Sequence, residues 1–152
     1  MEKFENQLNS IIADLYNWVP KVEERALRTA FGSLVTAAEA RILDVIGQRS
    51  EKMTISEVAA ALQITVPTIT IALKKLVDKG FVTKTACIAD GRRFLVSLTQ
   101  QGENICETHS RFKEKLAEAA TAGLSDDEKD ILLSCVKKLS EFFVTPSSVN
   151  GT

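Results

Sequence analysis

The sequence predicts a mostly α-helical protein of the α+β class, a winged helix-turn-helix with long N- and C-terminal helices beside it. Three observations predict this fold. Apolar residues recur at helical spacing along most of the 152 residues. The period changes to two between Phe81 and Leu98, where β-branched residues are frequent. A helical pattern from Thr65 to Gly80 comes directly before that stretch, behind a shorter helical pattern and a tight break.

The N-terminal third predicts two helices. The first is long and amphipathic, and Pro20 should kink or break it unless this proline opens a new turn. Its apolar residues at helical spacing are Phe4, Leu8, Ile11, Ile12, Leu15, Val19 and Val22. Thr36 is expected to cap the second helix, with Glu39 as the other half of a capping box, and this helix should end near Gly47.

The middle of the chain predicts a helix-turn-helix. Met53 to Ile55 is short and compatible with a strand, and Ser56 is expected to cap a compact helix over Glu57 to Leu62. The next helix runs from Thr65 to Gly80. Pro67 suits its first turn and the glycine suits its left-handed end.

A β-hairpin should follow, with strands over 81–88 and 93–98 and a turn at 89–91. We interpret Ala86 to Val96 as the wing. Thr99 is expected to cap a helix that reaches about Ala120, with Ile105, Phe112 and Leu116 facing inward. Ser125 and Glu128 open a last helix, whose apolar residues are Ile131, Leu132, Cys135, Leu139, Phe142 and Phe143. The expected divisions of the chain are a winged-helix domain over residues 35–99, helical regions over 1–34 and 100–144, and a flexible tail over 145–152.

Charge is unevenly distributed along the chain. The net charge is −1, but the segment from Thr54 to Leu98 carries +3 and the remainder carries −4. A basic centre attracts phosphate locally, although charged runs are usually solvated faces.

The helix from Thr65 to Gly80 has two distinct faces. Ile69, Ala72, Leu73 and Leu76 share one face and should seat the helix on the core. The candidate DNA-contacting residues on the rest of the helix are Thr65, Pro67, Thr68, Thr70, Ile71, Lys74 and Lys75. Small hydroxyl residues can approach base edges, an isoleucine can meet a thymine methyl group, and lysines suit phosphates. The alternative is an ordinary amphipathic helix with a solvated polar face.

The hairpin turn adds further candidates, namely Lys84, Asp90, Arg92 and Arg93. An arginine fits the negative potential of a narrow minor groove. Asp90 can hold an arginine by a forked salt bridge, and Gly91 is free to adopt a positive φ. The alternative here is a solvated surface turn.

The segments Thr65–Thr70, Leu76–Val82 and Asp90–Gly102 resemble the MarR family of bacterial transcription regulators. The resemblance implies a homodimer whose two winged-helix lobes bind a pseudo-palindromic operator in double-stranded DNA. Residues 35–99 would then be the DNA-binding domain, and residues 1–34 and 100–144 the dimerisation region. It places Thr65, Pro67, Thr68, Thr70 and Lys74 toward the groove, and it matches Asp90 and Arg92 to the wing's Asp-x-Arg pair. The family usually has arginine at the position of Gly91 and a small residue at that of Arg93. This difference leaves open which of the two wing arginines, Arg92 or Arg93, enters the groove.

Two shorter segments, Asp44–Gly47 and His109–Phe112, are similar to the branch of this family that represses fatty-acid synthesis genes. That similarity implies an apolar small-molecule or acyl-carrier-protein-linked effector. His109 and Phe112 are the candidate effector residues, beside an apolar cleft between the first helix and the helix after Thr99. The alternative for His109 is a surface histidine or a local hydrogen-bond donor.

Other function classes are less well supported. No catalytic constellation, cofactor motif or metal-ligand spacing is evident, so we expect no enzyme, no cofactor and no metal. We interpret the acidic residues Glu39, Asp44 and those from Asp126 to Glu128 as helix caps and solvated faces. Redox sensing through Cys87, near the wing arginines, is an alternative switch, whereas Cys106 and Cys135 are interpreted as core residues. A winged helix that binds protein instead of DNA is another alternative. The cysteine pattern, and the absence of a signal sequence or a 20-residue apolar run, predict a cytoplasmic protein without membrane contact.

Overall fold

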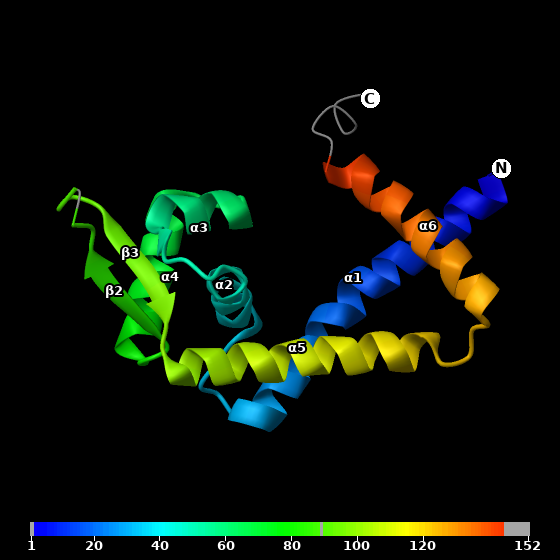
Figure 1. Ribbon diagram of the computed structural model, residues 1–152. Coiled ribbons are helices and arrows are strands. Elements are labelled where there is room, and N and C mark those ends of the chain that lie inside the picture. The colour runs from blue at the N-terminus through cyan, green and yellow to red at the C-terminus, as the bar shows by residue number, and fades with distance from the viewer. Residues whose placement is uncertain (1, 89, 145–152) are drawn as a thin grey trace. The chain divides into compact units, whose positions relative to one another are not determined.

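The computed structural model describes residues 2–88 and 90–144, so Ala89 in the wing and the expected tail, 145–152, lie outside the described residues. The winged-helix prediction is confirmed (Figure 1), since a mostly helical chain carries a small antiparallel sheet whose hairpin projects from one edge. The elements are α1 (Glu2–Phe31), α2 (Ala37–Gly47), β1 (Met53–Thr54), α3 (Ile55–Leu62), α4 (Val66–Asp78), β2 (Val82–Ala86), β3 (Phe94–Leu98), α5 (Gln100–Thr121) and α6 (Asp126–Val144).

The chain forms two compact units, residues 1–112 and 113–152. The division falls inside α5, which is continuous across it. The first unit contains the predicted winged helix, and we call residues 35–99 the winged-helix lobe. The second unit contains the rest of α5 and α6, where the predicted Ser125 cap is confirmed by its hydrogen bonds with Glu128.

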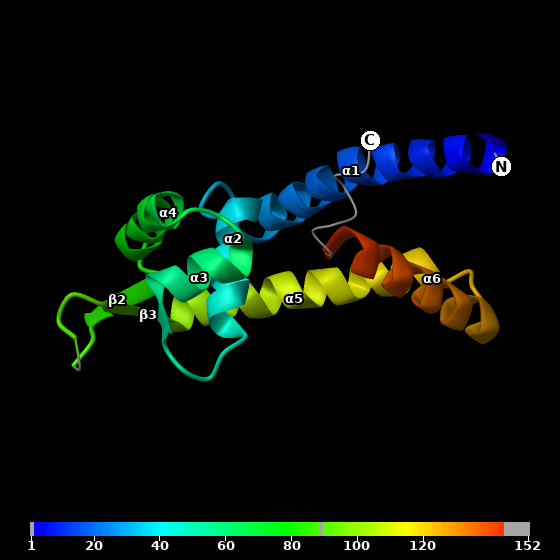
Figure 2. The same ribbon diagram turned by 90° about the horizontal axis from the view of Figure 1, so that it is seen from above.

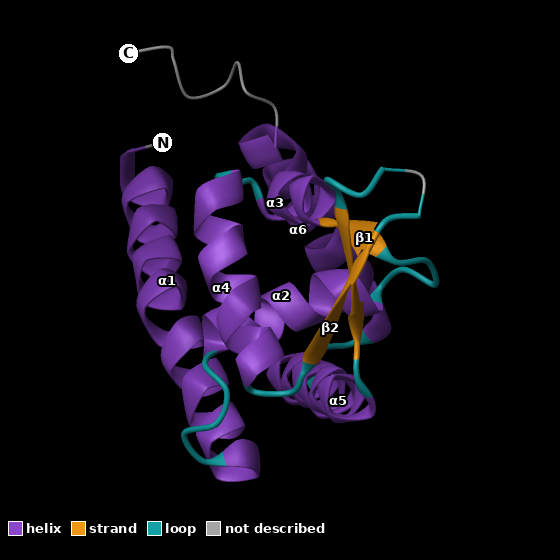
Figure 3. Cartoon of the chain, turned by 90° about the vertical axis from the view of Figure 1, so that its left-hand side faces the viewer, coloured by secondary structure: helices purple, strands orange, loops and turns teal. Residues whose placement is uncertain are grey.

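The sheet has the strand order β1-β3-β2, and both pairings are antiparallel (Figure 3). Val82 pairs with Leu98 at one end of the hairpin and Ala86 pairs with Phe94 at the other. Met53 pairs with Val96 on the opposite side of β3. The predicted hairpin is therefore confirmed, with strands shorter than expected.

The core lies between the sheet and the helices of the lobe. Its side chains are apolar and almost completely buried, and they include those by which α4 packs on the lobe. Its central side chains include Leu43, Met53, Val58, Ile69, Leu73, Leu76, Val82 and Val96.

Two helix boundaries differ from the sequence predictions. Thr54, not Ser56, caps α3: its hydroxyl accepts from the Glu57 amide at 3.2 Å, and Glu57 accepts from the Thr54 amide at 2.7 Å. Thr54 ends strand β1 and so already has the extended backbone of a cap, whereas Ser56 lies inside the first turn. In the first helix, Pro20 causes no break, since α1 continues through it. A proline has no amide hydrogen for the carbonyl one turn earlier in the helix, but this segment is exposed, so water can bond that carbonyl instead.

Gly102 allows the start of α5 to lie against the end of the turn before β2. A Cβ at this position would collide with the carbonyl oxygen of Phe81. Thr99 caps this helix as predicted, accepting from the Gly102 amide at 3.2 Å, and its hydroxyl donates to the Gly80 carbonyl at 2.7 Å.

Among the described helices, none is by itself long and apolar enough to cross a membrane. Only α3 and α4 taken together have the length and apolar composition of a membrane-spanning helix, and the chain bends by 111° at the break between them.

Candidate nucleic-acid interface

Helix α4 has a defined beginning and end. The Thr65 hydroxyl accepts from the Thr68 amide, and Pro67 lies in the first turn, where a missing amide hydrogen costs nothing. At the other end, Gly80 adopts a φ of 79°, the left-handed conformation expected of it.

The two faces of α4 are as predicted. Ile69, Leu73 and Leu76 are buried, and Ala72 is partly buried against the core. The candidate residues Thr65, Pro67, Thr68, Thr70, Ile71, Lys74 and Lys75 are all exposed. Ile71 is 63% exposed, a large apolar side chain with no place in the core.

The threonine hydroxyls of α4 are already engaged locally. Thr65 Oγ1 and Thr68 Oγ1 are 2.8 Å apart, and Thr70 Oγ1 donates to the Val66 carbonyl at 2.7 Å. The hydroxyl of Thr70 therefore keeps acceptor capacity on this face, while its hydrogen is committed to its own helix.

The hairpin of β2 and β3 projects at the same end of the first unit as α4 (Figures 1 and 2). Lys84 and Phe94 lie on one face of this hairpin, with Lys84 Nζ 3.9 Å from the centre of the Phe94 ring. A cation over an aromatic face is held electrostatically, so Phe94 restrains this lysine on the hairpin. Phe94 was not among the predicted site residues.

The wing turn is closed by backbone hydrogen bonds. Cys87 N donates to the Arg93 carbonyl at 2.8 Å, and Arg93 N donates to the Asp90 carbonyl at 2.9 Å. Asp90 Oδ1 accepts from the backbone amide of Arg92 at 3.0 Å, so this aspartate orders the turn through the backbone and not by the expected forked salt bridge. The expected positive φ at Gly91 is also wrong, because the positive-φ glycines of the described chain are Gly32 and Gly80.

The two wing arginines have different surroundings. Hydrogen bonds from Thr54 hold the pKa of Glu57 below its ordinary value, and attraction to Arg49 and Arg93 adds to this effect. Both wing arginines are exposed, and of the two it is Arg93 whose charge attracts this carboxylate.

The candidate effector residues do not line an open cleft. His109 is 1% exposed, which contradicts the surface alternative, and both of its ring nitrogens lie against carboxylates, those of Glu23 and Asp44. Phe112 is partly buried. Asp44 was interpreted as a cap or a solvated residue, and its partly buried contact with His109 corrects that interpretation.

A hollow of about 320 Å³ does lie between the end of α1 and the start of α5, where a cleft was expected. Its lining is mainly apolar with three polar residues, and it includes neither His109 nor Phe112. The lining residues are Phe31, Leu34, Val35, Lys79, Phe81, Gln101, Asn104 and Ile105.

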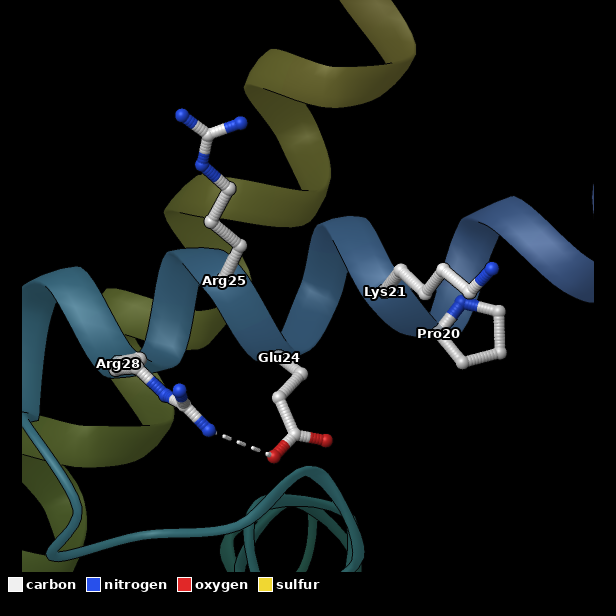
Figure 4. A pocket seen from close by; sticks show the side chains of 5 residues that line it. All are labelled: Pro20, Lys21, Glu24, Arg25 and Arg28. Carbon is white, nitrogen blue, oxygen red and sulfur yellow. Dashed lines mark ion pairs between the residues drawn. The ribbon is translucent and has the colours of Figure 1, made fainter.

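A second hollow, on α1 alone, lacks convergent groups. Figure 4 shows the side chains of Pro20, Lys21, Glu24, Arg25 and Arg28 spread along one helix, with Arg25 pointing away from the ion pair. That pair joins Arg28 to Glu24 at 3.8 Å and both partners are exposed. This surface offers no enclosed place for a ligand.

The comparisons with known proteins agree with this geometry. The model of the MarR family matches residues 35–93, which span α2 to the wing turn. The chain also superimposes on Streptococcus pneumoniae FabT, solved in complex with DNA, with a TM-score of 0.85 and 27% identity over 91% of this chain and 96% of FabT. Residues 35–93 are therefore similar to the MarR family, and the fold of the chain is that of MarR-type regulators.

Other MarR-type proteins are similar over different shares of the chain. A mutant MarR from E. coli, complexed with operator DNA, has a TM-score of 0.70 and 28% identity over 88% of this chain and 93% of that one. SarZ of Staphylococcus saprophyticus is 36% identical over 43% of this chain and 45% of SarZ. An HTH-type regulator of Mycobacterium bovis is 30% identical over 54% of this chain and 57% of the relative. The chain spans between 45% and 62% of the length of the curated relatives it matches.

The chain exposes apolar surface outside the lobe. On α1 the exposed apolar side chains are Phe4, Ile11, Ile12, Leu15, Tyr16, Trp18, Val19 and Val22. On α6 they are Ile131, Leu132, Leu133, Val136, Leu139 and Phe142. The expectation that Cys135 is a core residue is wrong for the single chain, since Cys135 is exposed, whereas Cys87 and Cys106 are partly buried.

Proposed function

We propose that the chain is a transcriptional repressor that binds double-stranded DNA as a homodimer, at a pseudo-palindromic operator. The observation that carries this proposal is the pairing of an exposed hydroxyl and lysine face on α4 with a basic hairpin at the same end of the unit (Figure 2). FabT and E. coli MarR were each solved with DNA, which supports the same use of this fold here.

The proposed roles on α4 follow from side-chain chemistry. Thr68 and Thr70 face base edges, and Ile71 contacts a thymine methyl group. Lys74 and Lys75 lie further along the helix and bind phosphates. The N-terminus of the helix adds its positive dipole end to the attraction for the DNA backbone.

We assign the minor groove to Arg92 and not to Arg93. Arg92 is exposed in a turn whose backbone Asp90 orders, so its guanidinium is free to enter a narrow groove. Arg93 is attracted to Glu57 and is better placed to stiffen the base of the wing. Lys84, restrained by Phe94, contacts the phosphates between the two grooves.

The homodimer accounts for the exposed apolar faces of α1 and α6, because contiguous exposed apolar surface of this extent marks an interface. A two-fold dimer presents two α4 helices to one side of a duplex, about 34–36 Å or one helical turn apart. An inverted-repeat operator follows from that symmetry.

Selection of duplexes from a random library by the purified protein, followed by sequencing, tests this proposal. We expect an inverted repeat to be enriched, with half-sites about ten base pairs apart. Enrichment of a single half-site would contradict the homodimer. A library that stays random would contradict the DNA-binding proposal and favour a winged helix that binds protein.

We further propose an apolar, acyl-type effector that occupies the hollow between α1 and α5. The volume of about 320 Å³ and the apolar lining are those of a small-ligand pocket, with Lys79, Gln101 and Asn104 as its polar groups. Affinity for the selected operator should change when acyl-loaded acyl carrier protein is added, and Leu34→Trp, at an exposed lining position, should remove the change. An unchanged response in that variant would place the effector elsewhere.

A further inference from the structure

The one histidine of the chain lies at a junction of three helices. His109 of α5 has Nε2 2.8 Å from Glu23 Oε1 of α1 and Nδ1 2.9 Å from Asp44 Oδ2 of α2. Glu23 Oε2 also accepts from Arg41 Nη2 at 2.7 Å. These four side chains form a continuous hydrogen-bonded network, which we call the His109 network.

The chemistry of the His109 network is directional and charged. Both ring nitrogens lie within hydrogen-bond distance of a carboxylate, so the ring of His109 bridges α1 and α2. Burial raises the pKa of Glu23, but the hydrogen bonds from Arg41 and His109 outweigh it and hold this pKa below its ordinary value. The Arg41 guanidinium and the His109 ring therefore supply partners for the two carboxylates, as buried polar groups require.

An apolar side chain at the position of His109 would be the less costly way to pack three helices together, because buried ions lose hydration. What the ions add is geometry, since charge-assisted hydrogen bonds hold only within a narrow range of distance and angle. Apolar contacts tolerate sliding and rotation. The His109 network therefore restrains the relative orientation of α1, α2 and α5 more strongly than apolar packing does.

The position of the His109 network along α1 and α5 matters. Glu23 is the first buried residue of α1 among those described, and the segment before it is exposed except for the partly buried Leu8. His109 is the last buried residue of α5. Asp44 belongs to α2, whose Ile42, Leu43 and Ile46 are core residues of the lobe. The network thus lies where α1 and α5 both leave the lobe.

We propose that the His109 network fixes the angle at which α1 and α5 leave the winged-helix lobe, and that in the dimer it thereby sets the operator spacing the protein accepts. The second half of this inference rests on the proposed function, and the first half does not. Glu23, Asp44 and His109 are positioning residues that act through α4 and contact no DNA.

A matched pair of substitutions at Glu23 isolates the geometry. Glu23→Gln keeps every contact with a neutral ring, because its amide nitrogen donates to His109 Nε2 and its oxygen accepts from Arg41. Glu23→Leu removes both contacts and leaves an apolar side chain of similar size. His109→Gln is an independent disruption, since one amide group cannot donate to two carboxylates on opposite sides.

The first measurement needs neither DNA nor a dimer. Spin labels at Asn17 of α1 and Thr70 of α4, in a background without Cys87, Cys106 and Cys135 and diluted with unlabelled chain, report the angle between α1 and the lobe within one chain. Both labelled positions are exposed. We expect a single narrow distance distribution in the parent and in Glu23→Gln, and a distribution at least about twice as broad in Glu23→Leu and His109→Gln. Equal widths in all four would overturn the proposal.

The second measurement uses duplexes in which the spacer between the half-sites changes by one base pair at a time. Loss of both hydrogen bonds of residue 23 should lower affinity for the preferred spacer about tenfold in Glu23→Leu, and much less for the neighbouring spacers, while Glu23→Gln, which keeps a hydrogen bond to each partner, keeps the parent profile. Uniform loss over all spacers would mean ordinary destabilisation and would overturn the link to spacing. If the parent binds no duplex, the proposed function fails, and the distance distributions still decide the role of the network.

Discussion

Glu39 shows how one carboxylate supports two elements. It closes the predicted capping box of α2, accepting from the Thr36 amide at 3.0 Å. Both of its oxygens also lie 2.8 Å from Lys79 Nζ, which donates in addition to the Leu34 carbonyl at 2.9 Å. The capping pattern is local and was predicted. The ion pair joins residues 40 positions apart, and no local pattern indicates it.

The acid stability of the protein should depend on this carboxylate. Burial raises the pKa of Glu39, but the hydrogen bonds from Lys79 and Thr36 outweigh burial and lower it below the ordinary value of 4.5. As the pH falls, the unfolded chain therefore binds a proton first, so the contribution is complete above pH 4.5 and is lost as the pH falls through the folded pKa. Urea unfolding between about pH 7 and about pH 3 should show Glu39→Gln with lower stability at neutral pH and a smaller loss in acid. An equal loss in both proteins would contradict this role.

Gly102 gives a second prediction at the scale of a residue. In Gly102→Ala the added methyl group meets backbone, the Phe81 carbonyl, which cannot move aside as a side chain can. We expect the free energy of unfolding to fall by about 1–3 kcal/mol, measured by thermal or urea denaturation. Gly123→Ala is the matched control, since nothing lies within 4 Å of a Cβ there, and it should change stability by about 0.5 kcal/mol or less.

At the scale of elements, local patterns were reliable where the signal itself is local. The faces of α4, its proline and its glycine end were all predictable from spacing, and so was the hairpin. The cap of α3 was assigned to Ser56 because two hydroxyl residues lie two positions apart, and only the pairing of β1 with β3 shows that Thr54 is the extended one. The detail of the wing turn likewise depends on backbone hydrogen bonds that composition does not specify.

The wing supplies a prediction that separates its two arginines. Arg92→Ala should weaken operator binding about tenfold and reduce the preference for A·T pairs under the wing, because the guanidinium in the minor groove is lost. Arg93→Ala should cost about threefold or less, since this residue supports the wing from Glu57. Fluorescence anisotropy with operator duplexes measures both. The reverse order would assign the groove to Arg93.

At the scale of the whole molecule, the sequence predicted which helices are amphipathic and could not show what they cover. The apolar stripe of α1 is exposed in the single chain, where an intramolecular core is the usual expectation. His109 shares a face with the buried Gly102 and Ile105, although it was expected to be an effector residue or, as the alternative, a surface histidine or a local hydrogen-bond donor. Its partners lie 65 and 86 residues away, so their identity depends on the fold.

The proposed dimer can be tested on that apolar stripe. Ile11→Asp combined with Leu15→Asp places two charges where we expect a buried interface, both at exposed positions that the single chain does not need for its core. Sedimentation should show loss of the dimer, with helical content largely kept. Lys3→Asp, an exposed position near the start of the same helix, is the control and should leave the dimer intact. A dimer that survives the double substitution would exclude this face as the interface.

The salt dependence of operator binding tests whether the lobe binds DNA through its lysines. If lysines of α4 and the wing bind phosphates, the logarithm of the association constant should fall linearly with that of the salt concentration. Lys74→Ala and Lys84→Ala should each reduce the slope by about 1, whereas Lys137→Ala, an exposed lysine of α6, should leave it unchanged. A slope near zero in the parent protein, or one that neither lobe substitution alters, would contradict the account.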